Sequence, residues 1–541
     1  MKPRLILFSI VMVGFLLRVL FINSSPPALY GDELTITLDV YSIIKTGHDQ
    51  LGNFLPLTFK MSAGRPAGYV YGSIPFIALF GPSAIGVRTL SILSGIGIII
   101  LLYLLGRKLF SEKVGLIAAA IGAISPWEIS LSRVGFESHF ALFLALLGTY
   151  LFILARNKPI LYIFSALSFG LTLHTYLTYK VAILLFLPLL LWHQDIFKKA
   201  IRINKKHFLI GAFVFIVLGE LAFSQTFLAG SENRFLNINI FSQNSIKDTI
   251  EQKINFERQI TKLPKFISRF FYNKPIEYSK VFIDNYLQNF SMDFLVLHGD
   301  RNPRHNMATM GEIFFADLVL IIIGLVAFWY KERRTVLFLI FWLLLAPIPT
   351  AVVDTPHALR SAFMLPPLIL FSAMGLVTVL NYKNKLFTSL VLLFFIIQFI
   401  FFIQKLFFLA PQEYSNFWSY PAKLASEIVK ENKDKYTYVI LSDRIDNIEF
   451  AYPVYTKTDP RIVISQNKER ALLNSSRLKR FENVYIGYIP DKKIEEFVNA
   501  LKGSVLYIGP AADRESLSKS ESVDGLDGLK ALTLMRKISN P

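Results

Sequence analysis

Carboxylates, histidines and cationic side chains gather in a few short polar segments of an otherwise apolar chain of 541 residues. Two adjacent carboxylates, Asp32 and Glu33, follow the first apolar stretch. Such a pair suits general-base catalysis, because one carboxylate can take a proton from an attacking hydroxyl. The alternative interpretation is an acidic pair that begins a helix. A third carboxylate, Glu137, precedes a later apolar stretch and either shares a cavity with Asp32 or caps a helix.

Further polar segments could bind phosphate or sugar oxygens through cations, phenols and imidazoles. The turn that contains His174, Tyr176 and Lys180 could hold a phosphate, or form an interfacial belt in which the lysine snorkels. The segments 298–306 and 354–361 are rich in arginine and histidine. Their candidate binding residues are Asp300, Arg301, Arg304, His305, His357 and Arg360.

A metal site is the weaker interpretation of these segments. His298 and His305 could both bind a metal ion, but their spacing specifies no coordination geometry. We therefore assign no metal ligands from the sequence, and a divalent cation remains possible as a cofactor.

The elements that must position these residues are apolar segments of membrane-spanning length. A helix needs about 20 residues to cross the hydrocarbon core, and about 11 segments approach that length. The hydrophobic fraction of 53% and the mean hydropathy of +0.46 agree with an integral membrane protein. The predicted spans are 5–22, 83–105, 114–131, 138–155, 159–175, 178–193, 207–229, 313–330, 335–353, 361–380 and 386–408.

Basic residues predict the orientation, because cytoplasmic loops are enriched in Lys and Arg. With the N-terminus inside, every inner connection is short and basic, and the candidate site residues all lie on the outer side of the plasma membrane. We expect residues 1–25 to be a retained signal anchor, since removing this span would break the alternation. The inner basic residues are Lys2, Arg4, Arg107, Lys108, Lys113, Arg156, Lys158, Lys198, Lys199, Arg202, Lys205, Lys206, Lys331, Arg333, Arg334, Lys383 and Lys385.

Composition excludes several classes of function. The net charge of +18 is largely this topological signal, so it does not indicate a nucleic-acid partner. The chain has no cysteine, which excludes disulfides, thiolate catalysis and zinc–thiolate sites.

The soluble parts are predicted to lie on one side. We divide the chain into a transmembrane module, 1–409, with long outer loops at 23–82 and 230–312, and a small extracytoplasmic α/β domain, 410–541. β-rich runs at 436–441, 461–465, 484–489 and 505–508 alternate with polar helical stretches in this tail. It has no glycine-rich nucleotide loop, so we expect it to dock or recognise an acceptor.

The polar segments together resemble the C-type (GT-C) membrane glycosyltransferases, in particular the branch related to protein O-mannosyltransferases and the aminoarabinose transferase of lipid A (glycosyltransferase family 39-like). The resemblance covers about 1–380 and rests on the order and sidedness of the motifs. These are Asp32-Glu33, residues 80–83 to Arg88, 125–126 to 132–133, Glu137, 174–180, 299–306, and His357 to Arg360 followed by Pro366.

The resemblance implies a GT-C fold and an inverting transfer of a hexosyl or pentosyl group. The donor would be a polyprenyl-phosphate-linked sugar reached from the outer leaflet among membrane lipids, and the acceptor a protein, lipid or glycan. Asp32 would be the base, with Glu33 beside it, and Glu137 matches a second carboxylate that is usually aspartate. Arg65 stands where relatives often have lysine, so a guanidinium would contact the phosphate there, while Lys180 and the arginines would neutralise the departing phosphate.

Two other functions remain open from the sequence. A transporter or flippase of lipid-linked glycans would need polar residues near the bilayer midplane. An oligosaccharyltransferase or ligase would use a pyrophosphate-linked donor instead, and a catalytically inactive scaffold ranks below both. For Glu220 and Asp317, which lie within predicted spans, we expect hydrogen bonds to neighbouring helices and assign no chemical role.

Overall fold

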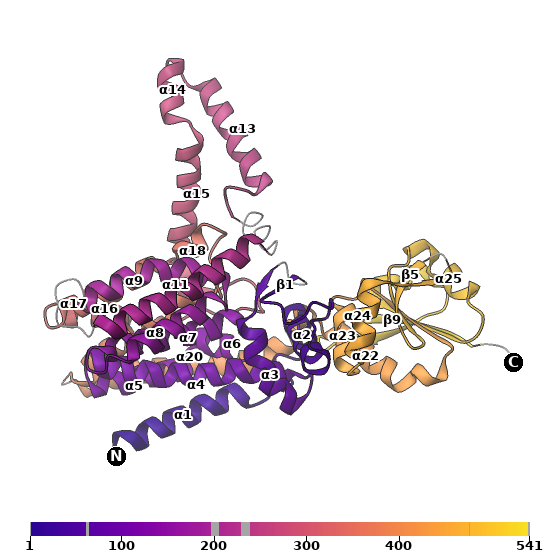
Figure 1. Cartoon of the computed structure of the whole chain (residues 1–541), viewed down its shortest axis with the longest axis horizontal. Coiled ribbons are helices and arrows are strands. Elements are labelled where there is room, and N and C mark those ends of the chain that lie inside the picture. The colour runs from indigo at the N-terminus through magenta and orange to yellow at the C-terminus, as the bar shows by residue number, and fades with distance from the viewer. Residues whose placement is uncertain are drawn as a thin grey trace.

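The computed structural model describes residues 2–60, 64–195, 205–228, 239–382, 384–474 and 476–538. Apolar helices form an elongated bundle, and a C-terminal sheet lies beyond one end of it (Figure 1). The bundle helices are α1 (Pro3–Val19), α4 (Ala84–Leu109), α5 (Glu112–Ile124), α7 (Glu137–Ala155), α8 (Leu161–Leu173), α9 (Leu177–His193), α11 (Lys205–Leu228), α16 (Phe315–Trp329), α17 (Arg333–Leu345), α19 (Leu365–Leu380) and α20 (Lys385–Gln404).

Six helices in the described part of the chain are long and apolar enough to cross a membrane, or up to seven if one bent pair is a single span. The predicted number of about 11 is therefore not reached by this measure. The bundle also contains shorter apolar helices that coincide with predicted spans, including α8, α9 and α16.

The predicted span 114–131 is broken in two. α5 ends at Ile124, and α6 (Pro126–Ser132) continues at an angle of 60° to it. Pro126 has no N–H for a helical hydrogen bond, and the Ser125 hydroxyl accepts a hydrogen bond from the Glu128 N–H to start the new helix.

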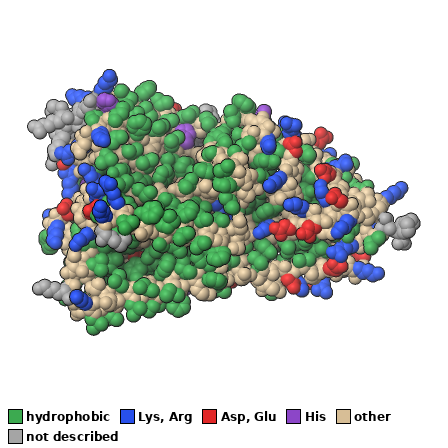
Figure 2. All heavy atoms as spheres, turned by 90° about the horizontal axis from the view of Figure 1, so that it is seen from below, with side chains coloured by type: hydrophobic (Ala, Val, Ile, Leu, Met, Phe, Trp, Pro, Cys, Tyr) green, Lys and Arg blue, Asp and Glu red, His purple; other side chains and the backbone are tan. Residues whose placement is uncertain are grey.

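The surface follows the predicted sidedness of charge. Figure 2 shows hydrophobic side chains covering the bundle, Lys and Arg gathered at the end away from the C-terminal sheet, and both signs of charge on the sheet domain. Of the inner basic residues, Lys198, Lys199, Arg202 and Lys383 lie outside the described residues, as does 230–238 of the second outer loop. The orientation in the membrane stays a prediction.

The first outer loop folds into short elements over one end of the bundle. α2 (Gly31–Thr46) begins with Asp32 and Glu33 in its first turn, so this acidic pair does start a helix, as the alternative interpretation held. The other elements of the loop are the antiparallel strands β1 (Thr58–Phe59) and β2 (Arg65–Pro66), and α3 (Gly68–Phe80).

The second outer loop contains a helical hairpin that projects sideways from the bundle (Figure 1). Its described helices are α13 (Asn244–Ile260), α14 (Lys265–Phe271) and α15 (Lys274–Gln288). A π-helical turn, Asp293–Leu297, then leads into the polar segment 298–306 beside the bundle.

The C-terminal region forms a seven-stranded mixed sheet with the order β4-β5-β6-β3-β7-β9-β8. Three of the four predicted β-rich runs fall on central strands, but 461–465 lies in α24, because Asp459 caps a helix that Pro460 begins. The strands are β3 (Tyr438–Ser442), β4 (Ala471–Leu473), β5 (Ser476–Phe481), β6 (Val484–Gly487), β7 (Val505–Pro510), β8 (Glu521–Asp524) and β9 (Lys530–Lys537). Its helices include α22 (Tyr420–Asn432), α23 (Ile448–Tyr455), α24 (Pro460–Lys468) and α25 (Ile494–Ala500).

The sheet domain packs on the first outer loop through a shared apolar core. Leu34 and Leu38 of α2 belong to the same buried cluster as Ala422 and Tyr452 of the tail. The Tyr455 hydroxyl accepts a hydrogen bond from the Leu29 N–H at 2.9 Å. The tail therefore holds the start of α2, and with it Asp32, in place.

Candidate active site

A cavity of about 370 Å³ opens where the first outer loop meets the bundle. Its lining gathers predicted site residues from sequence segments that are far apart, together with apolar side chains such as Val181, Val352 and Leu359. The predicted site residues that line it are Asp32, Glu137, Tyr176, His305, His357 and Arg360.

The two adjacent carboxylates of α2 have different surroundings. The Asp32 side chain is 47% exposed and faces the cavity. Glu33 is fully buried and pairs with Arg88 of α4 through two hydrogen bonds of 2.8 and 2.9 Å, and it accepts a third from the Gly135 N–H. Glu33 therefore joins α2 to α4, and only Asp32 is placed to contact a substrate in the cavity.

Arg65 links the cavity carboxylates. Its guanidinium lies 2.7 Å from Asp32 Oδ1, 2.5 Å from Glu137 Oε1 and 3.0 Å from the Thr35 hydroxyl, and it is almost fully buried. Burial opposes its charge, but Glu137 and Asp32 raise the pKa of Arg65 above its ordinary value. The sequence prediction gave Arg65 a phosphate contact, whereas the structure uses its guanidinium to hold two carboxylates of like charge side by side.

Tyr30 is a cavity residue that the sequence prediction missed. Burial, together with the charges of Asp32 and Glu137, raises the pKa of Tyr30 well above its usual value, so the phenol stays protonated and can donate a hydrogen bond. The available signal was its position two residues before Asp32.

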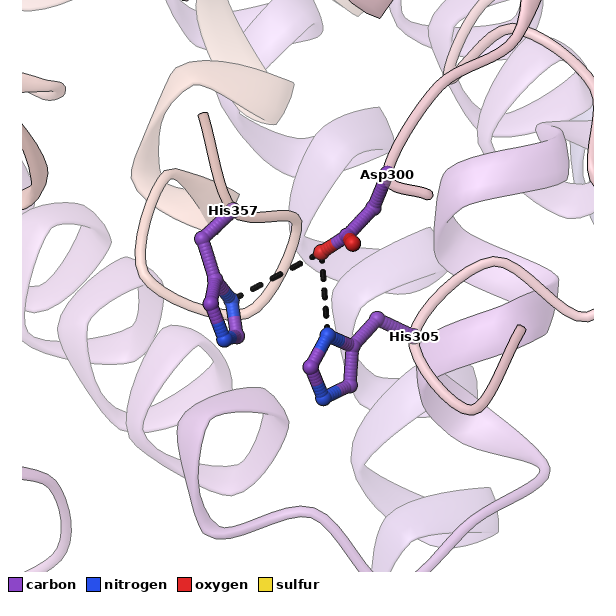
Figure 3. Close-up of side chains that lie close together, drawn as sticks. All are labelled: Asp300, His305 and His357. Atoms are coloured by element: carbon purple, nitrogen blue, oxygen red, sulfur yellow. Dashed lines mark hydrogen bonds and ion pairs between the residues drawn. The ribbon is translucent and has the colours of Figure 1, made fainter. Parts of the chain in front are cut away.

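Asp300, His305 and His357 form a compact cluster at the edge of the cavity (Figure 3). His305 Nδ1 lies 3.0 Å from Asp300 Oδ2, and His357 Nδ1 lies 3.7 Å from the same oxygen. The backbone N–H groups of Asn302 and Ala358 donate to the Asp300 carboxylate at 2.9 and 2.8 Å. These contacts fix the carboxylate between the two imidazoles.

The electrostatics of this cluster define its protonation state. Burial opposes ionisation of Asp300, but the hydrogen bond and the charge of His305 outweigh it and hold the pKa of Asp300 at about 2. Burial, aided by His305 and Arg360, lowers the pKa of His357 well below its usual value. At neutral pH Asp300 is therefore a carboxylate and His357 a neutral imidazole.

The neighbouring Glu312 was also missed by the sequence prediction. Its Oε1 accepts a hydrogen bond from the Asp300 N–H at 2.9 Å, and burial raises its pKa well above the usual value. Burial thus favours the neutral form of Glu312, which supports the turn that carries Asp300 through this hydrogen bond.

A second cavity, of about 590 Å³, shares His305, His357 and Arg360 with the first as a common wall. Arg301 lines the second cavity, is 87% exposed, and lies 3.5 Å from Asp293. Buried Arg360 Nη1 has no hydrogen-bond partner within the described part of the chain. Arg360 is thus the guanidinium best placed to donate to an anion from either cavity.

Besides Glu33 and Arg65, three further predicted site residues line neither cavity. The Lys180 ammonium contacts the Ala222 carbonyl at 2.6 Å, and His174 Nε2 lies 2.9 Å from the Leu218 carbonyl, so both bind α11. Arg304 Nε donates to the Phe417 carbonyl at 2.5 Å and thereby holds the tail. Short-range sequence spacing could not reveal these backbone acceptors, because all of them belong to other elements.

The two charged residues within spans behave differently. Asp317 accepts a hydrogen bond of 2.6 Å from the Ser372 hydroxyl of α19, so the expected contact with a neighbouring helix is present. Glu220 instead has an exposed side chain on α11. The expectation of an internal hydrogen bond for Glu220 was wrong, because the sequence does not reveal which face of a helix meets its neighbours.

Comparison with known proteins relates this architecture to a family and to solved structures. Residues 69–221 match the model of the dolichyl-phosphate-mannose-protein mannosyltransferase family. Comparison with curated protein sequences gives no significant match.

Among solved structures, ArnT from Cupriavidus metallidurans bound to undecaprenyl phosphate has a TM-score of 0.54 at 10% identity, over 98% of this chain and 97% of ArnT. The oligosaccharyltransferase of Archaeoglobus fulgidus in the apo form has a TM-score of 0.50 at 15% identity, over 83% of this chain and 64% of that one. The chain spans 63% of the length of the same organism's oligosaccharyltransferase AglB in its complex with an inhibitory peptide and a dolichol-phosphate, where the TM-score is 0.48 at 14% identity over 84% of this chain.

The near-complete overlap with ArnT concerns the fold, and the matched segment 69–221 concerns the family. Together with the membrane-spanning helices of the bundle, these findings confirm the resemblance drawn from the sequence. The chain has helices of membrane-spanning length and the fold of the GT-C glycosyltransferases, and its residues 69–221 match the model of the dolichyl-phosphate-mannose-protein mannosyltransferase family.

Proposed function

We propose that this protein transfers a sugar from a polyprenyl-phosphate-linked donor to an acceptor hydroxyl at the outer face of the membrane. The observation that carries the proposal is a cavity lined both by the charged residues Asp32, Glu137 and Arg360 and by apolar side chains. An amphiphilic donor needs both kinds of surface, because its sugar phosphate is charged and its isoprenoid is not.

In this proposal Asp32 is the general base. It takes the proton of the acceptor hydroxyl as the acceptor oxygen attacks the anomeric carbon, and the bond from that carbon to the phosphate oxygen breaks. The polyprenyl phosphate leaves with the bonding electrons, and attack from the opposite face inverts the anomeric centre. Asp32 is suited to this step because its carboxylate is half exposed to the cavity while Arg65 fixes its orientation.

Arg360 is proposed to bind the departing phosphate. Arg360 lines the cavity, where an arginine can donate to phosphate oxygens, and its Nη1 makes no hydrogen bond within the described residues and lies 3.7 Å from Asp354 Oδ2. The Tyr30 phenol supplies a neutral donor to the sugar or phosphate in the same cavity. Lys180 and Arg304, which were predicted from sequence to bind the phosphate, instead serve backbone carbonyls.

A second candidate donor is a pyrophosphate-linked sugar or glycan. The observation that favours it is the adjoining cavity, where Arg301 and Arg360 could meet a second phosphate. A flippase is less well supported, because Glu220, the charge nearest to the middle of a span, is exposed on α11 and lines neither cavity.

Two measurements test the proposal. Mass spectrometry of lipid that co-purifies with the protein should detect a polyprenyl monophosphate or its glycoside, whereas a pyrophosphate would select the second donor. The second measurement is the release of polyprenyl phosphate from a panel of synthetic polyprenyl-phosphate sugars. From the dependence of this release on donor concentration, the donor affinity of Arg360→Ala should be about 10- to 100-fold lower than that of wild type, the effect of losing one charge-assisted hydrogen bond. Arg333→Ala, at the opposite end of the bundle, is the matched control and should behave as wild type. No release by wild type from any donor would contradict the proposal.

A further inference from the structure

We propose that Asp300, His305 and His357 bind a divalent transition-metal ion such as Zn²⁺ in the wall between the two cavities. These residues come from two separate loops and offer one carboxylate oxygen and two imidazole nitrogens within 4.8 Å of one another. Figure 3 shows the three side chains pointing toward a common centre.

The distances within the cluster suit tetrahedral coordination. Bonds of about 2.0–2.2 Å from a zinc ion to nitrogen and oxygen place neighbouring ligand atoms roughly 3.3–3.5 Å apart. The distances from Asp300 Oδ2, 3.0 Å to His305 Nδ1 and 3.7 Å to His357 Nδ1, lie on either side of that value. The two imidazole nitrogens lie within 4.8 Å of each other, so side-chain rotations that bring this third separation to the same value would place the three atoms on one face of a tetrahedron.

A hydrogen-bond network alone does not account for the cluster. Asp300 satisfies His305, but buried His357 Nδ1 has no hydrogen-bond partner among the described residues. Buried polar atoms without a partner are rare in folded proteins and costly in free energy. A metal ion would give His357 Nδ1 the ligand bond that hydrogen bonding among the described residues does not supply.

The surroundings of Asp300 resemble those of a metal ligand. The backbone N–H groups of Asn302 and Ala358 hold its carboxylate in one orientation, as hydrogen bonds from outside the coordination shell do in metal sites. Two nitrogen ligands and one oxygen ligand favour a transition metal over Mg²⁺ or Ca²⁺, which prefer oxygen.

The carboxylates that face the first cavity are a poorer place for a cation. Asp32 and Glu137 already share the buried guanidinium of Arg65, which neutralises them and fills the space between them. The first cavity is therefore lined both by a pair of carboxylates that binds a guanidinium and by the two histidines of the proposed metal site.

The metal would have an open coordination position, because the protein supplies three ligands. His305 and His357 line both cavities, so that position is reached by a phosphate oxygen from either side. This role toward a donor phosphate rests on the proposed function, whereas metal binding itself does not.

Metal binding can be measured on the full-length protein in detergent without any donor. After treatment with EDTA, the protein is titrated with Zn²⁺ by calorimetry and with Co²⁺ by visible absorption, and bound zinc is counted by elemental mass spectrometry. We expect one ion per chain and the intense visible bands of four-coordinate Co²⁺. His357→Ala and Asp300→Asn should each weaken binding by at least 10- to 100-fold.

His298→Ala is the matched control, because this histidine is adjacent in sequence to the cluster but 68% exposed and paired with Asp293. It should bind metal as wild type does. Asp300→Asn keeps one acceptor oxygen, for either the Asn302 or the Ala358 N–H, so a monodisperse gel-filtration profile together with lost metal binding excludes misfolding as the cause.

The proposal is overturned if wild type binds no ion, or if His357→Ala and wild type bind with equal affinity. Transfer activity that fails while stoichiometric metal binding persists would refute the proposed function and leave the metal site intact. If metal binding fails while transfer persists, the metal site is refuted and the proposed function stands.

Discussion

Asp32 and Glu33 are neighbours in sequence, yet neutralising Asp32 should affect catalysis and neutralising Glu33 should affect stability. Asp32 is half exposed to the cavity, whereas Glu33 and its partner Arg88 have no exposed side-chain surface. We expect Asp32→Asn to abolish transfer in a folded protein. We expect Glu33→Gln to destabilise the protein and to leave the chemistry of each folded molecule unchanged.

The magnitudes follow from the two environments. Loss of a general base typically lowers a rate by about 10²–10⁴. Asp32→Asn removes one of the two carboxylates that contact the buried Arg65 guanidinium, but Glu137 remains as its counter-charge, so we expect a smaller loss of stability than for Glu33→Gln. Glu33→Gln leaves the Arg88 guanidinium buried without a counter-charge, and breaking such a pair costs about 3–5 kcal/mol.

Two assays separate these effects. Release of polyprenyl phosphate in proteoliposomes, normalised to monodisperse protein, reports catalysis, and thermal unfolding followed by tryptophan fluorescence reports stability. Asp434→Asn, an exposed carboxylate of the tail, is the control and should change neither quantity. If the activity of Asp32→Asn stays within a few-fold of wild type, Asp32 is not the general base and only begins α2. Wild-type unfolding of Glu33→Gln would refute the structural role of its ion pair.

Three further predictions concern topology, pH and the tail. Ser518→Cys in this cysteine-free chain should react with a membrane-impermeant maleimide in intact cells, and labelling only after lysis would reverse the orientation. Burial raises the pKa of Asp39 from 3.8 to about 7, so the ionised carboxylate destabilises the folded state progressively between pH 4 and 7 and fully above pH 7. Asp39→Asn should therefore raise the free energy of unfolding by up to about 4 kcal/mol at pH 8 and leave it unchanged at pH 4. Unfolding measured at the two pH values checks this prediction. Arg304→Ala removes the hydrogen bond to the Phe417 carbonyl and should speed limited proteolysis of the tail without changing donor affinity, whereas weakened donor binding would restore the role predicted from sequence.

Much of the membrane bundle could be predicted from local properties of the chain. A membrane-spanning helix satisfies its own backbone hydrogen bonds, so apolar length alone marks where it runs. Breaks and shortened helices were harder to predict, as in the bent pair that meets at Pro126. The strand predicted at 461–465 was wrong for a related reason, since the Asp459 cap and Pro460 outweigh a short β-branched run.

The sequence by itself determined which residue types could do chemistry and on which side of the membrane they are expected. Polar residues between spans stand out against an apolar background, so Asp32, Glu137, His305, His357 and Arg360 could all be nominated from their positions. Sidedness followed from lysine and arginine in short loops, because that bias is a local property.

Only the tertiary structure decided how these residues divide the work. A helix turns by about 100° per residue, so two adjacent carboxylates point in different directions, and the packing of α4 made Glu33 a buried partner of Arg88 while Asp32 faced the cavity. The meeting of Asp300 with His357, and the use of Arg65 between two carboxylates, depend on contacts between distant segments. Long-range proximity is fixed by packing rather than by local spacing, and for that reason no pattern in the sequence specified it.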